Sequence, residues 1–194
     1  QTLEEEPTGT RMCFMMSEIK VLDKNKVFNI RAAQTKDLEA LMNITKACAQ
    51  FMISKGIYQW NDHYPDRASF QRDIQRRELY IAEINGTLAG CICISSLKDP
   101  EYLPVQWLSQ TENNLYIHRL AVHPHFQGQG YARKLMDYAE ACAQQKGFES
   151  VRLDTFSQNK RNQLFYELRG YQRLEDIYFP KQSEHTFHCY ELLL

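Results

Sequence analysis

A glycine-containing loop in the middle of the chain has residue types and spacing suited to binding an anion. The loop reads Gln127-Gly128-Gln129-Gly130-Tyr131-Ala132, and a long amphipathic helix is predicted to begin inside it. The first N–H groups of a helix have no partner within the helix, and the helix dipole places partial positive charge there. Because Gly128 and Gly130 have no side chains, a phosphate could approach the backbone closely. An ordinary strand–turn–helix connection is the alternative for the loop taken alone.

The loop matches neither of two common nucleotide-binding motifs. It is not G-x-G-x-x-G, the dinucleotide fingerprint, and it is not a P-loop because Lys134 is followed by Leu135. The loop therefore indicates a phosphate without indicating which ligand carries it.

Two further stretches narrow the interpretation. The sequence Leu120-Ala121-Val122-His123-Pro124 precedes the loop, and Asn159, Tyr166 and Gly170-Tyr171 follow it. In this order and at this separation, the motifs resemble those of the GNAT superfamily of N-acetyltransferases. The resemblance is strong over residues 114–171 and looser outside them.

The resemblance implies an α/β fold. It has a central mixed, mostly antiparallel sheet of six to seven strands, helices on both faces, and a splay beside the strand that binds acetyl-CoA. The acetyltransferase domain would cover residues 27–194, and residues 1–26 would form a partly flexible extension.

Hydrophobic periodicity predicts the elements that must position these motifs. Strands are predicted at Val27–Ala32, Leu79–Ile84, Thr87–Ser95, Leu115–Val122, Glu149–Thr155, Tyr171–Phe179 and His185–Leu193. Helices are predicted from an N-cap at Thr35 to Gly56, over Ala68–Arg77 with Asp66 as its cap, from the glycine loop to Gly147, and over Lys160–Leu168. The turn Asn85-Gly86 favours a hairpin between the second and third strands.

The resemblance implies acetyl-CoA as the acetyl donor. Its pyrophosphate would bind the backbone N–H groups of residues 128–132, and Gln127 stands where many relatives have arginine. The pantetheine arm would pair like an added strand with Leu120, Ala121 and Val122, and the N–H of Val122 would polarise the thioester carbonyl. Asn159 would either hydrogen-bond the arm or cap the following helix.

Direct attack by an amine requires a base, because a free alkylamine titrates near ~10.4. The predicted central strand has no carboxylate between Leu115 and Val122, so His118 is the candidate base. Alternation would place Tyr116, the second candidate, on the same face as His118, Leu120 and Val122. A histidine packed in the sheet is the alternative for His118. Tyr166 matches the family's general acid, and packing beside Phe165 is its alternative.

The acceptor pocket is predicted from aromatic and irregular segments. Tyr58 and Trp60 lie in the ring-rich stretch 56–67, which would form either a substrate wall, together with Tyr116, or a small cluster covering the first helix. The partner would be a small-molecule or peptide amine, which the sequence does not identify.

Composition excludes several classes of protein. The 194 residues are 43% hydrophobic and carry a net charge of −1, which points to neither nucleic acid nor a membrane. The six cysteines contain no C-x-x-C pair, so a reduced, cytoplasmic chain is expected, with Cys142 buried as packing. No metal is expected, because His123 and His125 lack a nearby third ligand. A homodimer is compatible with the sequence.

These observations predict an acetyl-CoA-dependent N-acetyltransferase that acts through a ternary complex. A non-catalytic acyl-CoA-binding sensor or regulatory module is the alternative, favoured by the missing strand carboxylate. A nucleotide-phosphate binder is a third interpretation.

Overall fold

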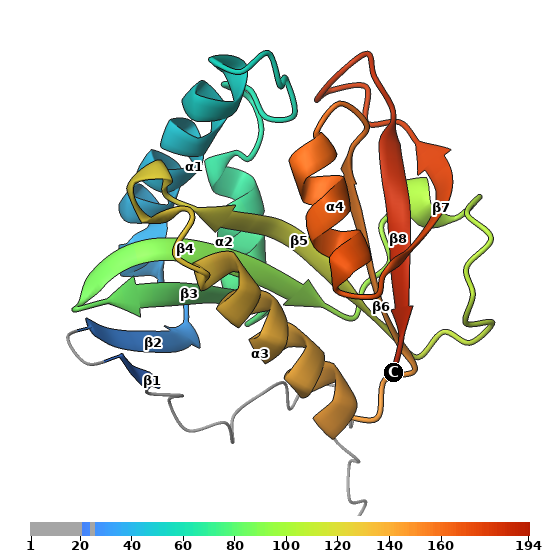
Figure 1. Ribbon diagram of the computed structural model, residues 1–194, viewed down its shortest axis with the longest axis horizontal. Coiled ribbons are helices and arrows are strands. Elements are labelled where there is room, and N and C mark those ends of the chain that lie inside the picture. Colours follow the sequence, from blue (N-terminus) through green and yellow to red (C-terminus); the bar gives the residue numbers. More distant parts are fainter. Residues whose placement is uncertain (1–20, 24–25) are drawn as a thin grey trace, which may run out of the picture.

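The computed structural model describes residues 21–23 and 26–194, and within them a mixed sheet lies between two layers of helices (Figure 1). The eight strands are β1 (Val21–Asp23), β2 (Lys26–Ala32), β3 (Leu79–Ile84), β4 (Thr87–Ser95), β5 (Asn114–Val122), β6 (Ser150–Phe156), β7 (Gln172–Ile177) and β8 (Phe187–Leu193). Their order is β1-β2-β3-β4-β5-β6-β8-β7. Every neighbouring pair is antiparallel except β5 and β6.

The sheet confirms the predicted fold class and adds one short strand to it. Six to seven strands were expected, and the eighth is the three-residue β1, which pairs with β2. This strand falls in the stretch predicted as an N-terminal extension. The rest of that extension, up to residue 25, lies outside the described residues.

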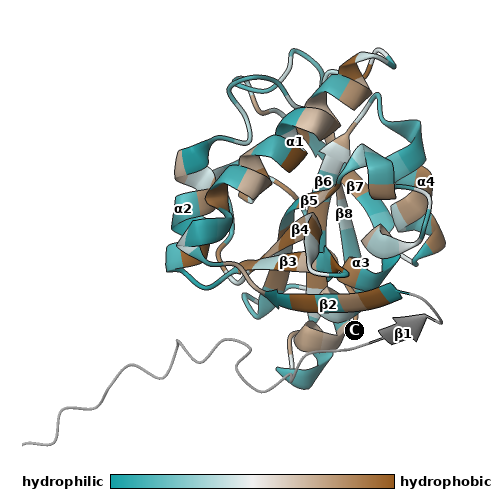
Figure 2. Cartoon of the chain, turned by 90° about the vertical axis from the view of Figure 1, so that its left-hand side faces the viewer, coloured by the Kyte–Doolittle hydropathy of each residue, from teal (hydrophilic) through white to brown (hydrophobic). Residues whose placement is uncertain are grey.

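Helices cover both faces of the sheet, with their apolar sides turned inward (Figure 2). α1 (Leu38–Ile53) and α2 (Arg67–Gln75) pack on one face, where Leu41 and Phe70 join a cluster with Leu79 and Ile81. α3 (Tyr131–Gln145) and α4 (Lys160–Leu168) pack on the other face, where Leu135, Met136 and Tyr166 contact the second large cluster. The buried stripe of α3 includes Cys142, as predicted.

The local signals of turns and caps account for most element boundaries. Asn85 and Gly86 have φ values of 50° and 78°, which suit a two-residue hairpin turn. Asp66 caps α2 by accepting a hydrogen bond from the N–H of Ser69 at 2.7 Å. The predicted N-cap at Thr35 is wrong.

A short 3₁₀ turn, η1 (Thr35–Asp37), precedes α1 instead. The N–H of Gln34 donates to Asp37 Oδ2 at 2.7 Å. The same carboxylate pairs with Arg31 of β2, at 2.9 Å. The chain therefore enters α1 through this buried carboxylate, and Thr35 does not cap the helix.

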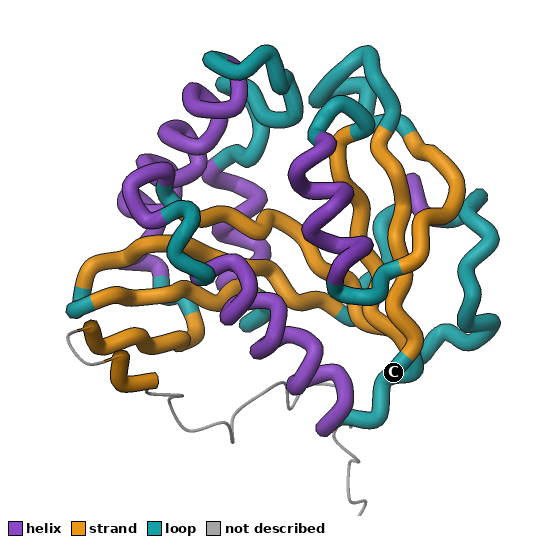
Figure 3. Tube along the Cα trace, viewed as in Figure 1, coloured by secondary structure: helices purple, strands orange, loops and turns teal. Residues whose placement is uncertain are grey.

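The sheet opens between β5 and β6, as the resemblance implied. The two strands pair only where Asn114–Tyr116 meets Ser150–Arg152, and beyond that point they diverge (Figure 3). A β-bulge interrupts the pairing of β5 with β4 between Cys91 and Cys93, and Arg119 of β5 has a φ of 50°. A bulge bends its strand and increases the local twist, which carries the end of β5 away from β6.

The bulge also overturns the predicted alternation along β5. Tyr116 packs in a cluster with Tyr102 and Trp107, whereas Val122 packs on the α3 face together with Ile117. Tyr116 and Val122 therefore do not share a face, because the extra residue at the bulge shifts the alternation by one.

Candidate functional site

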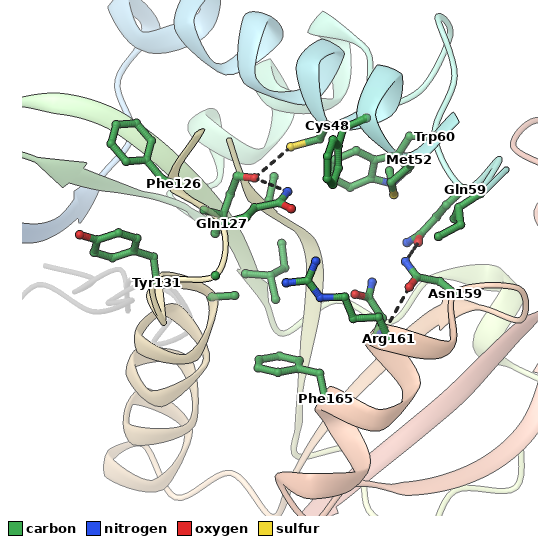
Figure 4. Close-up of a pocket in the computed structure, with 18 of the residues that line it drawn as sticks. Cys48, Met52, Gln59, Trp60, Phe126, Gln127, Tyr131, Asn159, Arg161 and Phe165 are labelled. Carbon is green, nitrogen blue, oxygen red and sulfur yellow. Dashed lines mark hydrogen bonds between the residues drawn. The ribbon is translucent and has the colours of Figure 1, made fainter. Parts of the chain in front are cut away.

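A cleft of about 570 Å³ lies where β5 separates from β6 (Figure 4). Its walls come from α1, the end of β5, the glycine loop with the start of α3, and α4. The lining residues include Cys48, Met52, Trp60, Leu120, Ala121, Val122, Gln127, Gly128, Gly130, Tyr131, Ala132, Asn159, Arg161 and Tyr166. The cleft thus brings together most of the residues that the two sequence motifs contain.

The glycine loop enters the cleft with its backbone uncovered. Gly128 and Gly130 have φ values of 75° and 83°, a left-handed conformation that favours glycine. A Cβ placed on either residue would meet no atom within 4 Å, so space lies beside both. Gly130 is the N-cap of α3, whose first residues Tyr131 and Ala132 also line the cleft. A helix N-terminus and an open glycine backbone therefore face the same space.

Gln129 differs from its neighbours in the loop. Its side chain accepts a hydrogen bond from Lys26 Nζ at 2.9 Å and donates to the carbonyl of His125 at 3.3 Å. It is exposed, and only its backbone could take part in the predicted anion site.

The backbone of Val122 is directed toward the cleft. The N–H of His123 donates to the carbonyl of Ala89 on β4 at 2.8 Å. In an antiparallel ladder, the adjacent residue Val122 then turns its own N–H and C=O away from β4. Its carbonyl accepts hydrogen bonds from Gln127 Nε2 at 2.9 Å and from Cys48 Sγ at 3.2 Å. Gln127 therefore holds the end of β5, and the N–H of Val122 faces the opening between the strands.

Tyr166 of α4 lines the cleft. Its ring is buried against Phe165, Tyr171 and Tyr190. Its hydroxyl makes no hydrogen bond within residues 21–23 and 26–194. Burial, followed by the nearby charge of Asp154, raises the pKa of this hydroxyl well above its usual value. Tyr166 therefore stays protonated at neutral pH and has an O–H to donate.

Asn159 is the N-cap of α4 and also lines the cleft. Its Oδ1 accepts from the N–H of Asn162 at 3.2 Å, and its Nδ2 donates to Gln59 Oε1 at 3.0 Å. The capping role predicted as an alternative is thus present. The bond to Gln59 joins α4 to the loop after α1, across the mouth of the cleft.

Comparison with known proteins identifies the family. The model of the Acetyltransferase (GNAT) family matches residues 38–171, more than half of the chain. The chain belongs to the GNAT family of acetyltransferases. This confirms both the predicted family and the predicted class of enzyme.

Individual relatives are distant in sequence. The chain is 24% identical to an N-acetyltransferase of Chlorobaculum tepidum over 155 residues, which covers 79% of this chain and 81% of the relative. It is 23% identical to the N-acetyltransferase YesJ of Bacillus subtilis, over 71% of this chain and 77% of YesJ.

Solved structures share the GNAT fold. A GNAT acetyltransferase from Listeria monocytogenes superimposes with a TM-score of 0.72 at 21% identity, covering 90% of this chain and 99% of that one. YncA from Salmonella typhimurium, solved with its cofactor acetyl-CoA, gives 0.65 at 18% identity, covering 86% and 94%. PaiA from Thermoplasma acidophilum, solved with coenzyme A, gives 0.64 at 20% identity, covering 86% and 99%.

A second, smaller cavity of about 70 Å³ adjoins the GNAT cleft. Five residues line both spaces: Gln59, Trp60, Leu120, Asn162 and Tyr166. The smaller cavity also reaches Asp99, His118 and Asp154, which do not line the larger one. Tyr166 thus lies at the junction of the two cavities, in position to face groups bound on either side.

Titratable groups in the smaller cavity have unusual pKa values. Burial, followed by the positive charge of Arg119, lowers the pKa of His118 to about 3. Burial raises the pKa of Asp154 to about 7, with Asp99 adding to the rise. His118 is therefore a weak base in this GNAT protein, whereas Asp154 titrates near neutral pH.

Sequence reasoning missed Asp154 because it sought a carboxylate only on the central strand. Asp154 lies on β6, and the hydroxyl of Tyr102 donates to its Oδ1. A signal was present, since Asp154 is the one acidic residue in the strand Ser150–Phe156. A lone carboxylate in a buried strand usually has a partner or a function.

The three residues predicted to contact the acceptor have different positions. Trp60 is buried and lines both cavities. Tyr58 is 59% exposed and lines neither. Tyr116 is buried in the core, and its hydroxyl accepts a hydrogen bond from Arg152 at 3.1 Å. The prediction of Tyr116 as the alternative base is corrected, because Tyr116 lines neither cavity and its hydroxyl is already bonded to Arg152.

Cationic side chains at the cleft were also missed. Lys55, Arg133 and Arg161 line it, and Figure 4 shows Arg161 extending from α4 into the space opposite Gln127. They surround a cleft where the family's usual arginine is replaced by Gln127, so they could supply attraction for phosphate groups.

Two other features of the described residues bear on function. Asp73, Glu78 and Cys93 offer ligand atoms within 4.8 Å of one another, a spacing that could suit a metal ion. Both oxygens of Asp73, however, bind the guanidinium of Arg119. His123 and His125 belong to no such group in this part of the chain. In the same residues, every helix is too short or too polar to cross a membrane.

Proposed function

We propose that this GNAT protein transfers an acetyl group from acetyl-CoA to a primary amine by direct attack in a ternary complex. One observation carries the proposal. The hydroxyl of Tyr166, without a hydrogen-bond partner in the described residues, lies where a cleft with an open glycine backbone meets a smaller acidic cavity. Donor and acceptor would bind in the two spaces and meet beside this hydroxyl.

The donor fits the larger cleft on chemical grounds. The backbone N–H groups of residues 128–132 would hold the pyrophosphate at the start of α3, as helix N-termini do for other phosphates. Lys55, Arg133 and Arg161 add positive charge around the cleft. The pantetheine arm would lie along Leu120–Val122, where β5 has no partner strand beyond Tyr116 on the β6 side.

The reaction requires charge stabilisation, loss of two protons from the ammonium nitrogen and protonation of the thiolate. The N–H of Val122 would stabilise the oxyanion that forms when the amine nitrogen attacks the thioester carbonyl. Asp154 would accept the proton of the amine, since its pKa of about 7 suits a base at neutral pH better than that of His118. As the carbon–sulfur bond breaks, Tyr166 would donate its proton to the departing thiolate and regain one from the nitrogen, which loses its second proton as the amide forms. The products are the N-acetyl amine and coenzyme A.

The absence of a carboxylate from β5 favours the alternative, a non-catalytic acyl-CoA-binding module. Asp154 weakens that alternative because β6 supplies a carboxylate from the neighbouring strand. The test is release of free coenzyme A from acetyl-CoA across a broad panel of primary amines. Acetyl transfer to any of them supports the enzyme. Binding of acetyl-CoA with no transfer to any amine would favour the sensor.

A further inference from the structure

The small cavity beside Tyr166 can hold only a small part of a substrate. Its volume of about 70 Å³ is far below the roughly 300–1,000 Å³ of pockets for drug-sized ligands. Aromatic rings of Trp60, Tyr64, Phe179 and Phe187 form part of its lining. It has room for a nitrogen and a few methylene groups, and a branch beside the nitrogen would meet these walls.

The charged groups of the cavity that are not already paired are acidic. Asp99 and Asp154 both line it, and burial raises the pKa of each carboxyl. The side chain of His118 is only 9% exposed, and its Nδ1 lies 3.7 Å from Asp99 Oδ2. Neither ring nitrogen makes a hydrogen bond within the described residues. Neither nitrogen is among the buried unpartnered atoms of the described residues, so the ring is open to the cavity, where an uncharged imidazole nitrogen can accept a hydrogen bond from a ligand N–H.

An ammonium group matches this arrangement. It offers three N–H donors and one positive charge, against two carboxylates and one uncharged imidazole. Its charge would offset the repulsion between the carboxylates, and the aromatic walls would favour a cation further. An anionic group would be repelled by the two carboxylates, and a neutral group would leave their negative charge without a counter-charge.

Among the described residues that line the cavity, none offers a free cation to receive a carboxylate. Arg119 lines it, but its guanidinium binds both oxygens of Asp73, at 2.6 and 2.8 Å, and donates to the hydroxyl of Tyr64 at 3.1 Å. The other lining residues are acidic, amide-bearing, neutral or apolar. A carboxylate next to the reacting nitrogen would therefore face Asp99 and Asp154 without a counter-charge.

We propose that this cavity binds the ammonium group of an unbranched primary amine with no carboxylate beside the nitrogen, such as the end of an aliphatic diamine or the side-chain amine of lysine. The proposal rests on the proposed acetyl transfer and names its acceptor class. Asp99 and His118 bind and orient the ammonium group, and Asp154 then takes its proton.

The test compares matched amines on the wild-type protein. 1-Aminobutane, 1,4-diaminobutane, the branched 2-aminobutane and the amino acid norleucine are assayed for kcat/KM with acetyl-CoA saturating. The unbranched amines should exceed norleucine by at least about 30-fold, because like charges at a binding site are heavily disfavoured. They should also exceed 2-aminobutane, because its branch takes up room in a cavity of about 70 Å³. Equal rates for norleucine and 1-aminobutane would overturn the proposal while leaving acetyl transfer intact.

Two substitutions test the role of the carboxylate. Asp99→Asn should raise KM for 1,4-diaminobutane by about tenfold or more, the usual size of a lost charge-assisted hydrogen bond, with KM for acetyl-CoA unchanged. Asp62→Asn makes the same chemical change at an exposed site that does not line the cavity, and it should leave both constants unchanged. Equal amine KM values for the two variants would contradict the proposal. Thermal denaturation checks that both are folded.

Calorimetry separates this proposal from the proposed function. 1,4-Diaminobutane is titrated into the protein saturated with coenzyme A, and norleucine serves as the comparison. Diamine binding without any turnover would keep the cavity's assignment and refute the transferase. Failure of the diamine to bind, or tighter binding of norleucine, would refute the assignment.

Discussion

Arg119 and Asp73 form a two-point ion pair behind the bulge of β5. Nε of Arg119 lies 2.6 Å from Oδ2 of Asp73, and Nη2 lies 2.8 Å from Oδ1. Both side chains are largely buried. Arg119 has a φ of 50°, a conformation that costs a residue with a side chain roughly 1–2 kcal/mol. The pair thus joins α2 to the strained residue at which β5 bends away from β6.

Asp73→Asn should destabilise the protein because it leaves a buried guanidinium without its counter-charge. The expected loss in the free energy of unfolding is about 3–5 kcal/mol, measured by urea denaturation. Asp137→Asn is the matched control, since Asp137 pairs with Arg169 at 2.7 Å but is 59% exposed. An exposed pair contributes about 0–1 kcal/mol. Similar losses in the free energy of unfolding for both variants would show that the buried Arg119–Asp73 pair contributes no more to stability than an exposed pair.

Tyr166→Phe should lower kcat for acetyl transfer by at least about tenfold, because the departing thiolate loses its proton donor. Affinity for coenzyme A, measured by calorimetry, should stay nearly constant, since the ring remains. Tyr171→Phe removes a neighbouring buried hydroxyl, which donates to Glu140 at 3.1 Å away from the cleft. This control should keep kcat, and an equal drop in both variants would indicate a general packing effect.

Patterns close in the sequence predicted the elements well. The hairpin of β3 and β4 and the helix α4 have their predicted bounds, because Asn85-Gly86 and the cap at Asn159 are local signals. The bulge at Arg119 could not be predicted this way. It depends on Asp73, 46 residues earlier, and on Gly90, where a Cβ would lie 2.5 Å from the carbonyl of Ala121.

Only the part of the candidate site that depends on local sequence signals could be predicted. Its donor side consists of two contiguous motifs, which the structure brings into one cleft with Tyr166. Its acceptor side is assembled from segments far apart in the chain. Asp99 comes from a loop and Asp154 from β6, and their approach to His118 follows from the sheet's opening, which no local pattern encodes.

Gly128→Ala should weaken binding of coenzyme A, because Gly128 lines the cleft at the predicted phosphate site. The expected increase in Kd is about tenfold or more, the usual cost of losing hydrogen bonds to a charged group. Gly147→Ala is closely matched, since the φ values are 75° and 70° and neither Cβ would meet an atom within 4 Å. Both variants should lose similar stability, but only Gly128→Ala should lose affinity. Equal affinities would place the phosphates elsewhere.

Asp154→Asn should lower acetyl transfer by about 100-fold or more and change its pH dependence. Asp154 must be ionised to accept a proton, and its pKa is about 7. In the wild type, kcat/KM should therefore rise as pH increases through about 7, and the variant should lose this rise. The charged or titratable groups near Asp154 are Tyr64, Asp99, Glu101, Tyr102, Arg119, Tyr166 and Cys189. If the rise persists in the variant, one of these groups or the amine itself causes it.

The same shift predicts how stability depends on pH. Burial raises the pKa of Asp154 above its ordinary value of 3.8, so the folded state binds this proton more tightly than the unfolded state. Its ionisation therefore costs stability as pH rises from about 4 to about 7. Relative to the wild type, Asp154→Asn should gain stability between pH 4 and pH 8. A constant difference across this range would contradict the raised pKa.

Arg161→Ala should have opposite effects on stability and on binding. Arg161 occupies the first turn of α4, where a positive charge opposes the helix dipole, so its removal should stabilise the unliganded protein by about 0.3–1 kcal/mol. Its side chain also lines the cleft opposite Gln127. Kd for coenzyme A should therefore rise by about three- to tenfold, and binding should depend less on salt.

Lys160→Ala separates the two effects of Arg161. Lys160 lies in the same first turn with the same charge, but its Nζ is directed to Gln163 Oε1 at 3.5 Å, and it does not line the cleft. Both variants should gain similar stability in thermal denaturation, whereas only Arg161→Ala should lose affinity in calorimetry at low salt. If Lys160→Ala weakens coenzyme A binding as much, the phosphates are attracted by the total positive charge at the start of α4 and not by the Arg161 side chain in particular. If neither does, Lys55 and Arg133 provide the positive charge that Gln127 lacks.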